Sequence, residues 1–295
     1  MALSTGISQG VCRVSSEGPP NPSSSDDPFT SNDSSFLHAQ YRTQDNLAVR
    51  IRTHERFSEE KVDFAGWILE AIRWRGKETV LDVGCGAGAY IDAVRQHTPG
   101  YIGGDLSLGM LRSLEQHDVA RVNLDAQQLP FACGTVDIIL ANHMLYHVPD
   151  IDRALREFRR VLQPGGRLVA ATNSAGNMAE LEAVQKEALA QLQLPVPGSL
   201  RPNLTFTLEN GAQLLSRHFE HVERRDLPGA LVFPDPQPII DYLASMHERV
   251  ERLLPEHLEW SDVAGALHGV LREKIERHGE FRVRKLSGAF VCWND

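Results

Sequence analysis

The sequence contains little cysteine: Cys12, Cys85, Cys133 and Cys292 are the four that occur in 295 residues. They lie far apart and form no Cys-x-x-Cys pair, so the sequence indicates neither a disulfide framework nor a cysteine-rich zinc site. We therefore expect free thiols, as in proteins of a reducing compartment.

Long hydrophobic runs are also missing. No uncharged apolar stretch approaches the roughly 20 residues that a membrane-spanning helix needs, and no Lys or Arg precedes Arg13 at the amino terminus. Neither a signal peptide nor a membrane anchor is therefore indicated. We expect a cytoplasmic protein with no membrane partner.

Basic residues are outnumbered. Lys and Arg total 30 against 39 Asp and Glu, which gives a formal net charge of -9. A chain with this balance lacks the general attraction to phosphate backbones that nucleic-acid-binding proteins use. The densest basic group, Arg153, Arg156, Arg159 and Arg160, is typical of a solvated helix face. Nucleic acid is not an expected partner.

Residues 1–35 are rich in Ser, Pro, Gly, Asn and Asp and have few large apolar side chains. Such a segment buries too little surface to offset its ordering entropy, so we expect it to be disordered. A charged, mixed segment follows from Phe36 to Phe57. Ser58 is then expected to cap a helix in which Val62, Phe64 and Ile68 recur at helical spacing.

After Gly76 the pattern becomes one of short apolar runs alternating with helical segments, which is typical of a parallel sheet covered by helices. The predicted strands are Thr79 to Val83, Tyr101 to Gly104, Ala120 to Asn123, Val136 to Asn142 and Arg167 to Thr172. The predicted helices between them are Ala89 to His97, Leu108 to Gln116 and Ile151 to Leu162, the last with Asp150 as N-cap.

Beyond Asn173 the sequence predicts helices at Met178 to Leu192, Thr207 to Phe219, Gln237 to Met246 and Ser261 to Ile275, and a strand pair at His221 to Asp226 and Gly288 to Trp293. The fold class is thus α/β: a Rossmann-like, doubly wound, mostly parallel seven-stranded sheet with an antiparallel last strand and a small helical cap. We expect one domain over residues 36–295. Its core spans about 59–175, the cap insertions about 176–204 and 235–280, and the last strand about 288–293.

A glycine-rich turn follows the first predicted strand, in the segment Val80-Leu81-Asp82-Val83-Gly84-Cys85-Gly86-Ala87-Gly88-Ala89-Tyr90. Glycines there allow the backbone to approach a ligand closely and to adopt positive φ. Gly84, Gly86 and Ala89 also fit the dinucleotide fingerprint of nicotinamide-dependent dehydrogenases, with Asp105 at the distance expected of a ribose ligand. The turn alone leaves both kinds of nucleotide cofactor open.

Acidic residues at three successive strand ends distinguish between these two kinds of nucleotide cofactor. With Asp82, the turn reads Asp-x-Gly-x-Gly-x-Gly. Asp105 ends the segment Tyr101-Ile102-Gly103-Gly104-Asp105-Leu106-Ser107, and Asp125 lies in Asn123-Leu124-Asp125-Ala126-Gln127-Gln128-Leu129-Pro130-Phe131. This pattern closely resembles the class I S-adenosylmethionine-dependent methyltransferases, and the resemblance runs from Thr79 to Asn173.

The resemblance implies a cofactor, S-adenosyl-L-methionine, and residues that bind it. Gly84, Cys85, Gly86 and Gly88 would pass beneath its methionine part, and Asp82 would help to place its amino group. Asp105 would accept from both ribose hydroxyls, Met110 would pack near the adenine, and Leu106 would also contact the cofactor. The alternative role of Asp105 is a helix cap. Asp125 would accept from the adenine amino group and the Ala126 amide would meet the ring, while Asn142 would also contact the cofactor. No metal is expected.

The loop after the fourth strand, Asn142-His143-Met144-Leu145-Tyr146-His147-Val148-Pro149-Asp150, faces the methyl group in that family. It lacks the Asn/Asp-Pro-Pro-Tyr/Phe pattern of amino- and amide-nitrogen methyltransferases, and the chain lacks the cysteines used on cytosine C5 or arsenic. The resemblance therefore implies a small-molecule acceptor methylated at O, N or C. The pattern does not fix the acceptor or the oligomeric state.

Methyl transfer from a sulfonium is an in-line displacement, for which alignment alone can supply about 7 to 11 kcal/mol. A phenol, alcohol or ammonium acceptor must also lose a proton, and His143 or His147 is the candidate catalytic base. The alternative is a packing or cofactor-adjacent role for His147, with alignment as the source of rate, because many family members carry a histidine there across unrelated acceptors.

Before the first core helix, the resemblance suggests that Arg50 pairs with the cofactor carboxylate and that Tyr41 contacts donor or acceptor, with surface or packing roles as the alternative. Cys85 is expected to be a small buried filler. An aromatic-rich set is expected to form either an apolar acceptor pocket or the cap's own core: Phe233, Tyr242, Met246, Trp260 and Trp293.

Three other functions stay open at this point. Methylation of RNA or protein would need a basic surface around the cofactor mouth, against which the acidic balance argues. A nicotinamide-dependent dehydrogenase would not need all three acids. A non-catalytic protein that only binds S-adenosylmethionine would keep the same cofactor residues, because fold does not guarantee function.

Overall fold

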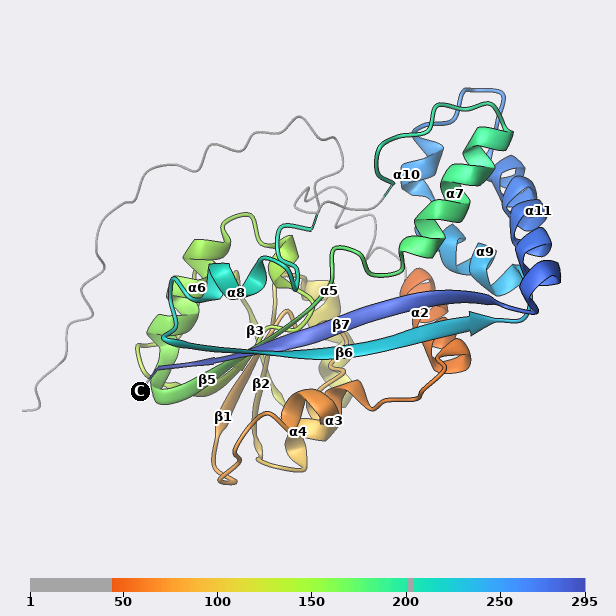
Figure 1. The fold of residues 1–295 in the computed structure, drawn as a ribbon. Helices are drawn as coiled ribbons and strands as arrows, with labels where there is room; N and C mark the ends of the chain where they lie inside the picture. Colours follow the sequence, from red (N-terminus) through yellow and green to blue (C-terminus); the bar gives the residue numbers. More distant parts are fainter. Residues whose placement is uncertain (1–43, 201–203, 295) are drawn as a thin grey trace, which may run out of the picture.

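The computed structural model describes residues 44–200 and 204–294. Its centre is a seven-stranded sheet of order β3-β2-β1-β4-β5-β7-β6 (Figure 1). The strands are β1 (Thr79–Val83), β2 (Gly100–Asp105), β3 (Ala120–Asn123), β4 (Val136–Leu140), β5 (Leu162–Asn173), β6 (His221–Phe233) and β7 (Phe281–Trp293). All pairs from β3 to β5 are parallel, and β7 runs antiparallel to both β5 and β6. The predicted sheet is confirmed. The predictions for residues 1–35 and for Tyr41 lie outside the described residues.

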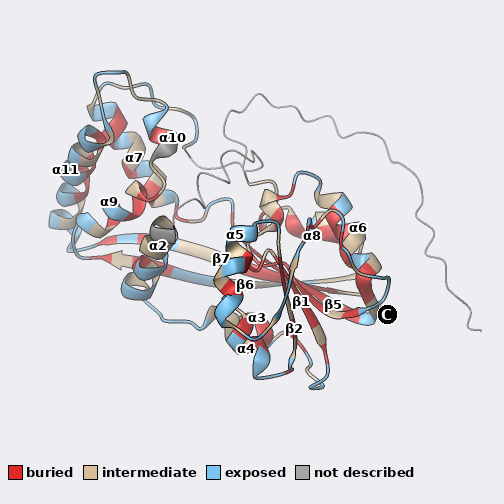
Figure 2. Ribbon diagram, turned by 180° about the vertical axis from the view of Figure 1, so that it is seen from behind, coloured by how far each residue is buried: buried red, intermediate tan, exposed pale blue. Residues whose placement is uncertain are grey.

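Helices cover both faces of this sheet, and their inward sides are buried (Figure 2). One face carries α3 (Phe64–Leu69), α4 (Ile91–Arg95) and α5 (Leu108–Ser113), followed by the 3-10 turn η1 (Leu114–Gln116). The other face carries α6 (Ile151–Val161) and α8 (Gly211–Leu215), and η2 (Leu145–His147) follows β4. Two apolar layers therefore hold the strand ends in fixed register.

Helix α6 forms as the sequence predicts. The Asp150 carboxylate accepts from the Arg153 amide at 2.9 Å as N-cap, and the buried side chains recur on one face: Ala154, Leu155, Phe158 and Val161. The expectation of a solvated arginine face is wrong for Arg160, whose guanidinium bonds Glu157 and the carbonyls of Leu129 and Phe131. Arg160 therefore anchors the loop before β4 to α6.

The helix expected after Ser58 begins later. Asp63 is its N-cap, accepting from the Gly66 amide at 3.0 Å, and Val62 stays 46% exposed. Ser58 instead forms a bridge with Leu231 of β6, because a helix missed by the sequence reading, α2 (Gln44–Phe57), ends immediately before it. The helix predicted at Thr207 to Phe219 is likewise only the five residues of α8.

Strands β6 and β7 are each 13 residues long, about twice the length that the sequence predicts. The end of β5, Asn173, pairs with Ser287, so the β7 residues from Phe281 to Leu286 pair with β6 alone. This free part of the hairpin projects past the carboxyl end of β5. The same edge carries the turns that follow β1, β2, β3 and β4.

The free hairpin supports four helices that pack around a core of their own (Figure 1). They are α7 (Ala179–Gln191), α9 (Gln237–Ala244), α10 (Glu248–Glu251) and α11 (Trp260–His278). Their core joins residues from helices and hairpin alike, including Leu189, Leu267 and Val283. We call these four helices the cap. Helix α2 joins it, since the Phe57 ring lies 4.9 Å from the Phe233 ring.

Shortening a buried side chain of the sheet core should lower the stability of the protein. Phe158 of α6 is fully buried, so we expect Phe158→Ala to lower the free energy of unfolding by about 3–5 kcal/mol, through lost burial and an unfilled cavity. Urea denaturation followed by circular dichroism measures this. Val62→Ala, at an exposed position, should change the free energy by less than about 0.5 kcal/mol; a loss below 1 kcal/mol for Phe158→Ala would show that the core repacks.

Candidate functional site

The glycine turn after β1 is bound to the neighbouring strand. The amides of Gly84 and Cys85 both donate to the Gly104 carbonyl of β2, at 2.7 and 3.1 Å. Gly84 has φ of 71°, and a Cβ there would come within 2.8 Å of Met144. Gly86 has φ of 52°, but a Cβ there would meet nothing within 4 Å. The turn is thus closely packed from below and open at Gly86, where a ligand can approach the backbone.

Asp82 lies under this turn with 1% of its surface exposed. The Tyr101 hydroxyl donates to its carboxylate at 2.7 Å. Burial, together with the nearby Asp105, outweighs that hydrogen bond and raises the pKa of Asp82 to about 7. Because no described cation pairs with Asp82, its carboxylate is suited to receive a positively charged ligand group.

Asp105 ends β2 beside the turn. One carboxylate oxygen accepts from the Gly86 amide at 2.9 Å and the other from the Ser107 amide at 2.8 Å. Ser107, and not Asp105, is the N-cap of α5, since its hydroxyl accepts from the Met110 amide. Each carboxylate oxygen keeps a second lone pair, so Asp105 can still accept two further hydrogen bonds.

The third acid, Asp125, follows β3 and is exposed. Its carboxylate accepts from the backbone amide of Gln127 at 2.8 Å and from that residue's side-chain amide. Leu106, the residue after Asp105, leaves 72% of its surface exposed, which is unusual for an apolar side chain. Met110 is half-buried and Ala126 is buried. These residues present acceptors and an apolar surface at one edge.

The loop after β4 carries two irregular features. The Asn142 side-chain oxygen accepts from the Ala171 amide at 3.1 Å, while its amide nitrogen is buried without a hydrogen-bond partner. His143 has φ of 54°, a left-handed conformation that is strained for a histidine, and its ring packs 5.5 Å from the Phe64 ring. Such features are typical of functional sites.

Burial and the nearby His147 lower the pKa of His143 to about 4. His143 is therefore a neutral imidazole at neutral pH, and a weak base. His147 lies in η2, with its ring 4.5 Å from the Tyr146 ring. The pKa of the Tyr90 phenol, which follows the glycine turn, is raised by burial first and then by Asp82 and Tyr146.

A group of polar side chains separates the cap core from the sheet core. His54 packs against Tyr242 of the cap, and its pKa is lowered to about 4 by burial first and then by the nearby basic groups Lys285, His143 and Arg50. The Lys285 ammonium donates to the Ser58 hydroxyl at 2.9 Å. We call Arg50, His54, Ser58, His143 and Lys285 the polar seam.

Sequence reasoning missed some of these residues. Nothing in the sequence pairs Tyr101 with Asp82. Lys285 did carry a signal: it follows Phe281 and Val283 at the inward positions of β7, where an apolar residue is expected. The nitrogen Nε of Arg50 is buried without a hydrogen-bond partner, and Cys85 is a buried free thiol, as a small filler would be.

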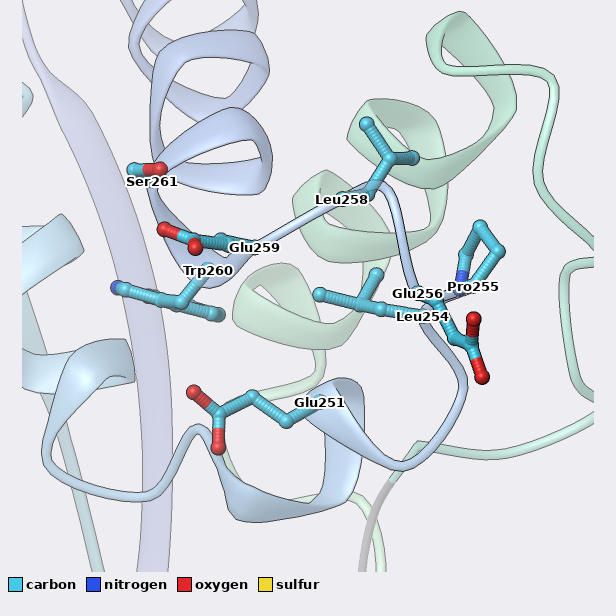
Figure 3. Close-up of a pocket in the computed structure, with 8 residues that line it drawn as sticks. All are labelled: Glu251, Leu254, Pro255, Glu256, Leu258, Glu259, Trp260 and Ser261. Atoms are coloured by element: carbon cyan, nitrogen blue, oxygen red, sulfur yellow. The ribbon is translucent and has the colours of Figure 1, made fainter.

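Of the two interpretations of the aromatic-rich set, the structure favours the cap's own core over an acceptor pocket. Phe233 and Tyr242 lie within the cap core, with Met246 and Trp260 at its margin. Trp293 lies at the opposite end of β7, stacked on His221 and Arg167. A pocket of about 370 Å³ does exist between α10 and α11 (Figure 3), lined by Glu251, Leu254, Pro255, Glu256, Leu258, Glu259, Trp260 and Ser261. It contains no residue of the glycine turn or of the loop after β4.

Within the part of the chain that the structure describes, no three His, Cys, Asp or Glu side chains gather as they would around a metal ion. No described helix has both the length and the apolar character to cross a membrane. Cys85, Cys133 and Cys292 form no disulfide, and Cys12 lies outside the described residues.

The segment of the chain that forms this edge of the sheet is similar to a known protein family. Residues 81–170 match the family described as "Methyltransferase domain". The chain is 34% identical over 112 residues to a demethylmenaquinone methyltransferase of Corynebacterium urealyticum, which covers 38% of this chain and 49% of that protein. It is 30% identical over 131 residues to a malonyl-[acyl-carrier protein] O-methyltransferase of Pseudescherichia vulneris, with 44% and 51% covered. The chain thus spans about half the length of these curated relatives.

A solved structure shares the fold. It is described as a putative methyltransferase from an antibiotic biosynthesis pathway of Anabaena variabilis. The TM-score is 0.54 at 16% identity, and the match covers 78% of this chain and 97% of the other. At this identity the likeness establishes the fold alone.

The burial of Asp82 predicts that the free energy of unfolding falls as the pH rises. An aspartate with a pKa near 3.8 unfolded and about 7 folded stabilises the fold fully below 3.8, and this stability is lost as the pH rises through 7. We expect Asp82→Asn, which can still accept from Tyr101, to stabilise the ligand-free protein at pH 8, by at most about 4 kcal/mol. The gain should vanish near pH 4.

Urea titrations at pH 4, 6 and 8 measure this effect. Asp92→Asn, at an exposed position of α4, is the matched control and should show no such trend. Equal stability of Asp82→Asn and the wild type at every pH would mean that the folded protein solvates this carboxylate.

Proposed function

Because this chain carries the core domain of the class I S-adenosylmethionine-dependent methyltransferases, we propose that it transfers a methyl group to an O, N or C atom of a small organic molecule. The observation that supports this most is that Asp82, Asp105 and Asp125 lie at the carboxyl ends of three adjacent parallel strands, where Asp105 also accepts from the amide of the open glycine turn. Three acids at successive strand ends suit a ligand that carries cationic groups, a diol and an amine together.

The described residues fit this cofactor. The open space above Gly86 gives room for its methionine part, and the buried Asp82 carboxylate offers a counter-charge to its ammonium. Asp105 has lone pairs for both ribose hydroxyls. Asp125 would exchange the Gln127 side chain for the adenine amino group, with the Ala126 amide at the ring edge.

The remaining contacts complete the set. Leu106 and Met110 would enclose the adenine, which explains the exposure of Leu106. Asn142 would satisfy its buried amide nitrogen on the cofactor, and Arg50 would bond the cofactor carboxylate. The backbone of Gly84, Cys85 and Gly88 shapes the turn beneath.

When bound, S-adenosyl-L-methionine supplies a methyl group on a sulfonium, which an acceptor atom displaces in line. The protein's part is to align the acceptor, exclude water and, for an acceptor that carries a proton, accept that proton. His147 is better placed for this than His143, whose lowered pKa makes it a weak base. His143 would instead orient the acceptor by a hydrogen bond.

A small acceptor is supported by the cap and by the relatives. The cap stands over the same edge as the glycine turn, which would restrict access to the methyl group. The two relatives are named for a demethylmenaquinone and for a malonyl group on acyl-carrier protein. Transfer to RNA or protein is the alternative.

Cofactor binding depends on Asp105 in this proposal. We expect S-adenosylhomocysteine to bind the wild type in a calorimetric titration and NADH not to bind. Asp105→Asn should weaken S-adenosylhomocysteine about 100-fold, because a neutral amide replaces a charged acceptor for two hydroxyls. Asp118→Asn, on the loop before β3, serves as control. Tighter binding of NADH would overturn the proposal in favour of a dehydrogenase.

His147 should act in the chemical step. We expect His147→Ala to lower kcat by about 100-fold or more, through loss of the proton acceptor, while the dissociation constant of S-adenosylhomocysteine stays unchanged. His218→Ala, on the outer side of the sheet bonded to Asp152, is the control. An unchanged kcat would assign His147 to packing and leave alignment as the source of rate.

The activity itself is tested with methyl-labelled cofactor and a metabolite extract from the source organism, followed by mass spectrometry. We expect label in a small-molecule product. Label in RNA or protein would support the alternative acceptor class. If the cofactor bound but no labelled product formed from any fraction, the protein would be a binding protein and the proposal would fail.

A further inference from the structure

The polar seam contains cations without acidic partners. Among the described residues, the Lys285 ammonium has one hydrogen-bond partner, the Ser58 hydroxyl, and neither Lys285 nor Arg50 takes part in a described salt bridge. The outward neighbours on β7 behave differently: Arg282 pairs with Glu59 and Arg284 with Glu180. Lys285 is half-buried, and with no carboxylate partner it leaves a charge that an anionic ligand would neutralise.

The surroundings of Lys285 strengthen this reading. Burial lowers the pKa of its ammonium, and Val283 before it on the same face is fully buried in the cap core. Of the groups near His54, Lys285 and Arg50 are cationic, whereas His143 is neutral at neutral pH. The buried Nε of Arg50 adds a hydrogen-bond donor without a partner. The seam thus combines positive potential with unused donors, in a partly desolvated position.

The seam also adjoins the proposed reaction site. His143 belongs both to the seam and to the loop after β4, close to His147. Lys285 lies two residues before Ser287 in β7, and Ser287 pairs with Asn173, the last residue of β5. Lys285 therefore lies just past the carboxyl end of β5. An acceptor held here would lie between the cap and the carboxyl edge of the sheet, with one end on the hairpin and the other at the glycine turn.

We propose that the methyl acceptor carries an anionic group, a carboxylate or a phosphate, which binds in the polar seam between the Lys285 ammonium, the Ser58 hydroxyl and the His54 imidazole. This inference rests on the proposed methyl transfer and specifies its substrate class. Lys285 supplies the charge, and the two neutral groups supply directed hydrogen bonds. Arg50 remains with the cofactor carboxylate, so that the two anions are held by different cations.

The first test separates acceptors by charge. An extract is divided on an anion-exchange column into retained and unretained fractions, and each is incubated with wild type and methyl-labelled cofactor. We expect label only in products of the retained fraction. Lys285→Met should raise the KM for that acceptor about 10- to 100-fold, with an unchanged dissociation constant for S-adenosylhomocysteine, and Lys285→Arg should restore part of the loss.

Arg284→Met is the matched control, since it removes the same charge from the adjacent, outward position of β7. It should leave KM unchanged. Labelling of unretained acceptors, with Lys285→Met as active as the wild type on them, would overturn the anion proposal while methyl transfer stood. A tenfold loss of S-adenosylhomocysteine affinity in Lys285→Met would also overturn it, by assigning the seam to the cofactor.

The second test does not depend on activity. Sodium malonate and sodium phosphate, each compared with sodium chloride at equal ionic strength, should raise the thermal midpoint of the wild type more than that of Lys285→Met, whose smaller shift measures the general stabilisation by these salts. The more effective salt identifies carboxylate or phosphate. Without added anion, Lys285→Met should melt at or above the wild-type temperature. No anion effect on the wild type beyond that on Lys285→Met, or a marked loss of stability in Lys285→Met, would make Lys285 a structural residue, whatever the labelling shows.

Discussion

The backbone ladder between β6 and β7 is the constraint on which the arrangement of the site depends. Thirteen residues of each strand pair in register, from His221 with Trp293 to Phe233 with Phe281. One half of this ladder completes the sheet beside β5, and the other half continues beyond it. A single hairpin thus belongs to both apolar cores, and its register decides which side chains face the space between them.

That register accounts for the contrast among the cations of β7. Arg282 and Arg284 alternate outward and find carboxylates near the surface, whereas Lys285 falls at an inward position after Val283. This inward lysine lies where the cap core meets the sheet core. His54 of α2 and Ser58, the residue after α2, lie against the hairpin there. The polar seam is therefore a product of long-range pairing between α2, β7 and the loop after β4.

The parts of the fold that the sequence predicts are those set by local pattern. The strand ends carrying Asp82, Asp105 and Asp125 follow short apolar runs, and α6 has both a capping aspartate and a regular apolar face. Lengths set by tertiary pairing were underestimated: β6 and β7 continue through polar residues because each supplies the other's hydrogen bonds. Helix α2 was missed because its amphipathic pattern is weak, and it is stabilised by the cap that it contacts.

The same division applies to the site. The cofactor residues adjoin one another in short motifs, so their chemistry can be read from the chain. The partners of the buried groups come from distant segments: Tyr101 for Asp82, and Ser58 for Lys285. The sequence predicts Ser58 as a helix cap, a local role typical of serine. In the structure Ser58 directly follows the end of α2, and its hydroxyl accepts from the Lys285 ammonium.

The free half of the hairpin also has a mechanical meaning. A two-stranded ribbon twists easily along its length but is stiff against stretching, since its ladder hydrogen bonds and covalent backbone oppose extension. The cap is joined to the sheet by this ribbon, by α2 and by the link from β5 to α7, which hydrogen-bonds to β7. The length of the ribbon therefore sets how far the cap stands from the sheet, and with it the length of a molecule that could lie between them.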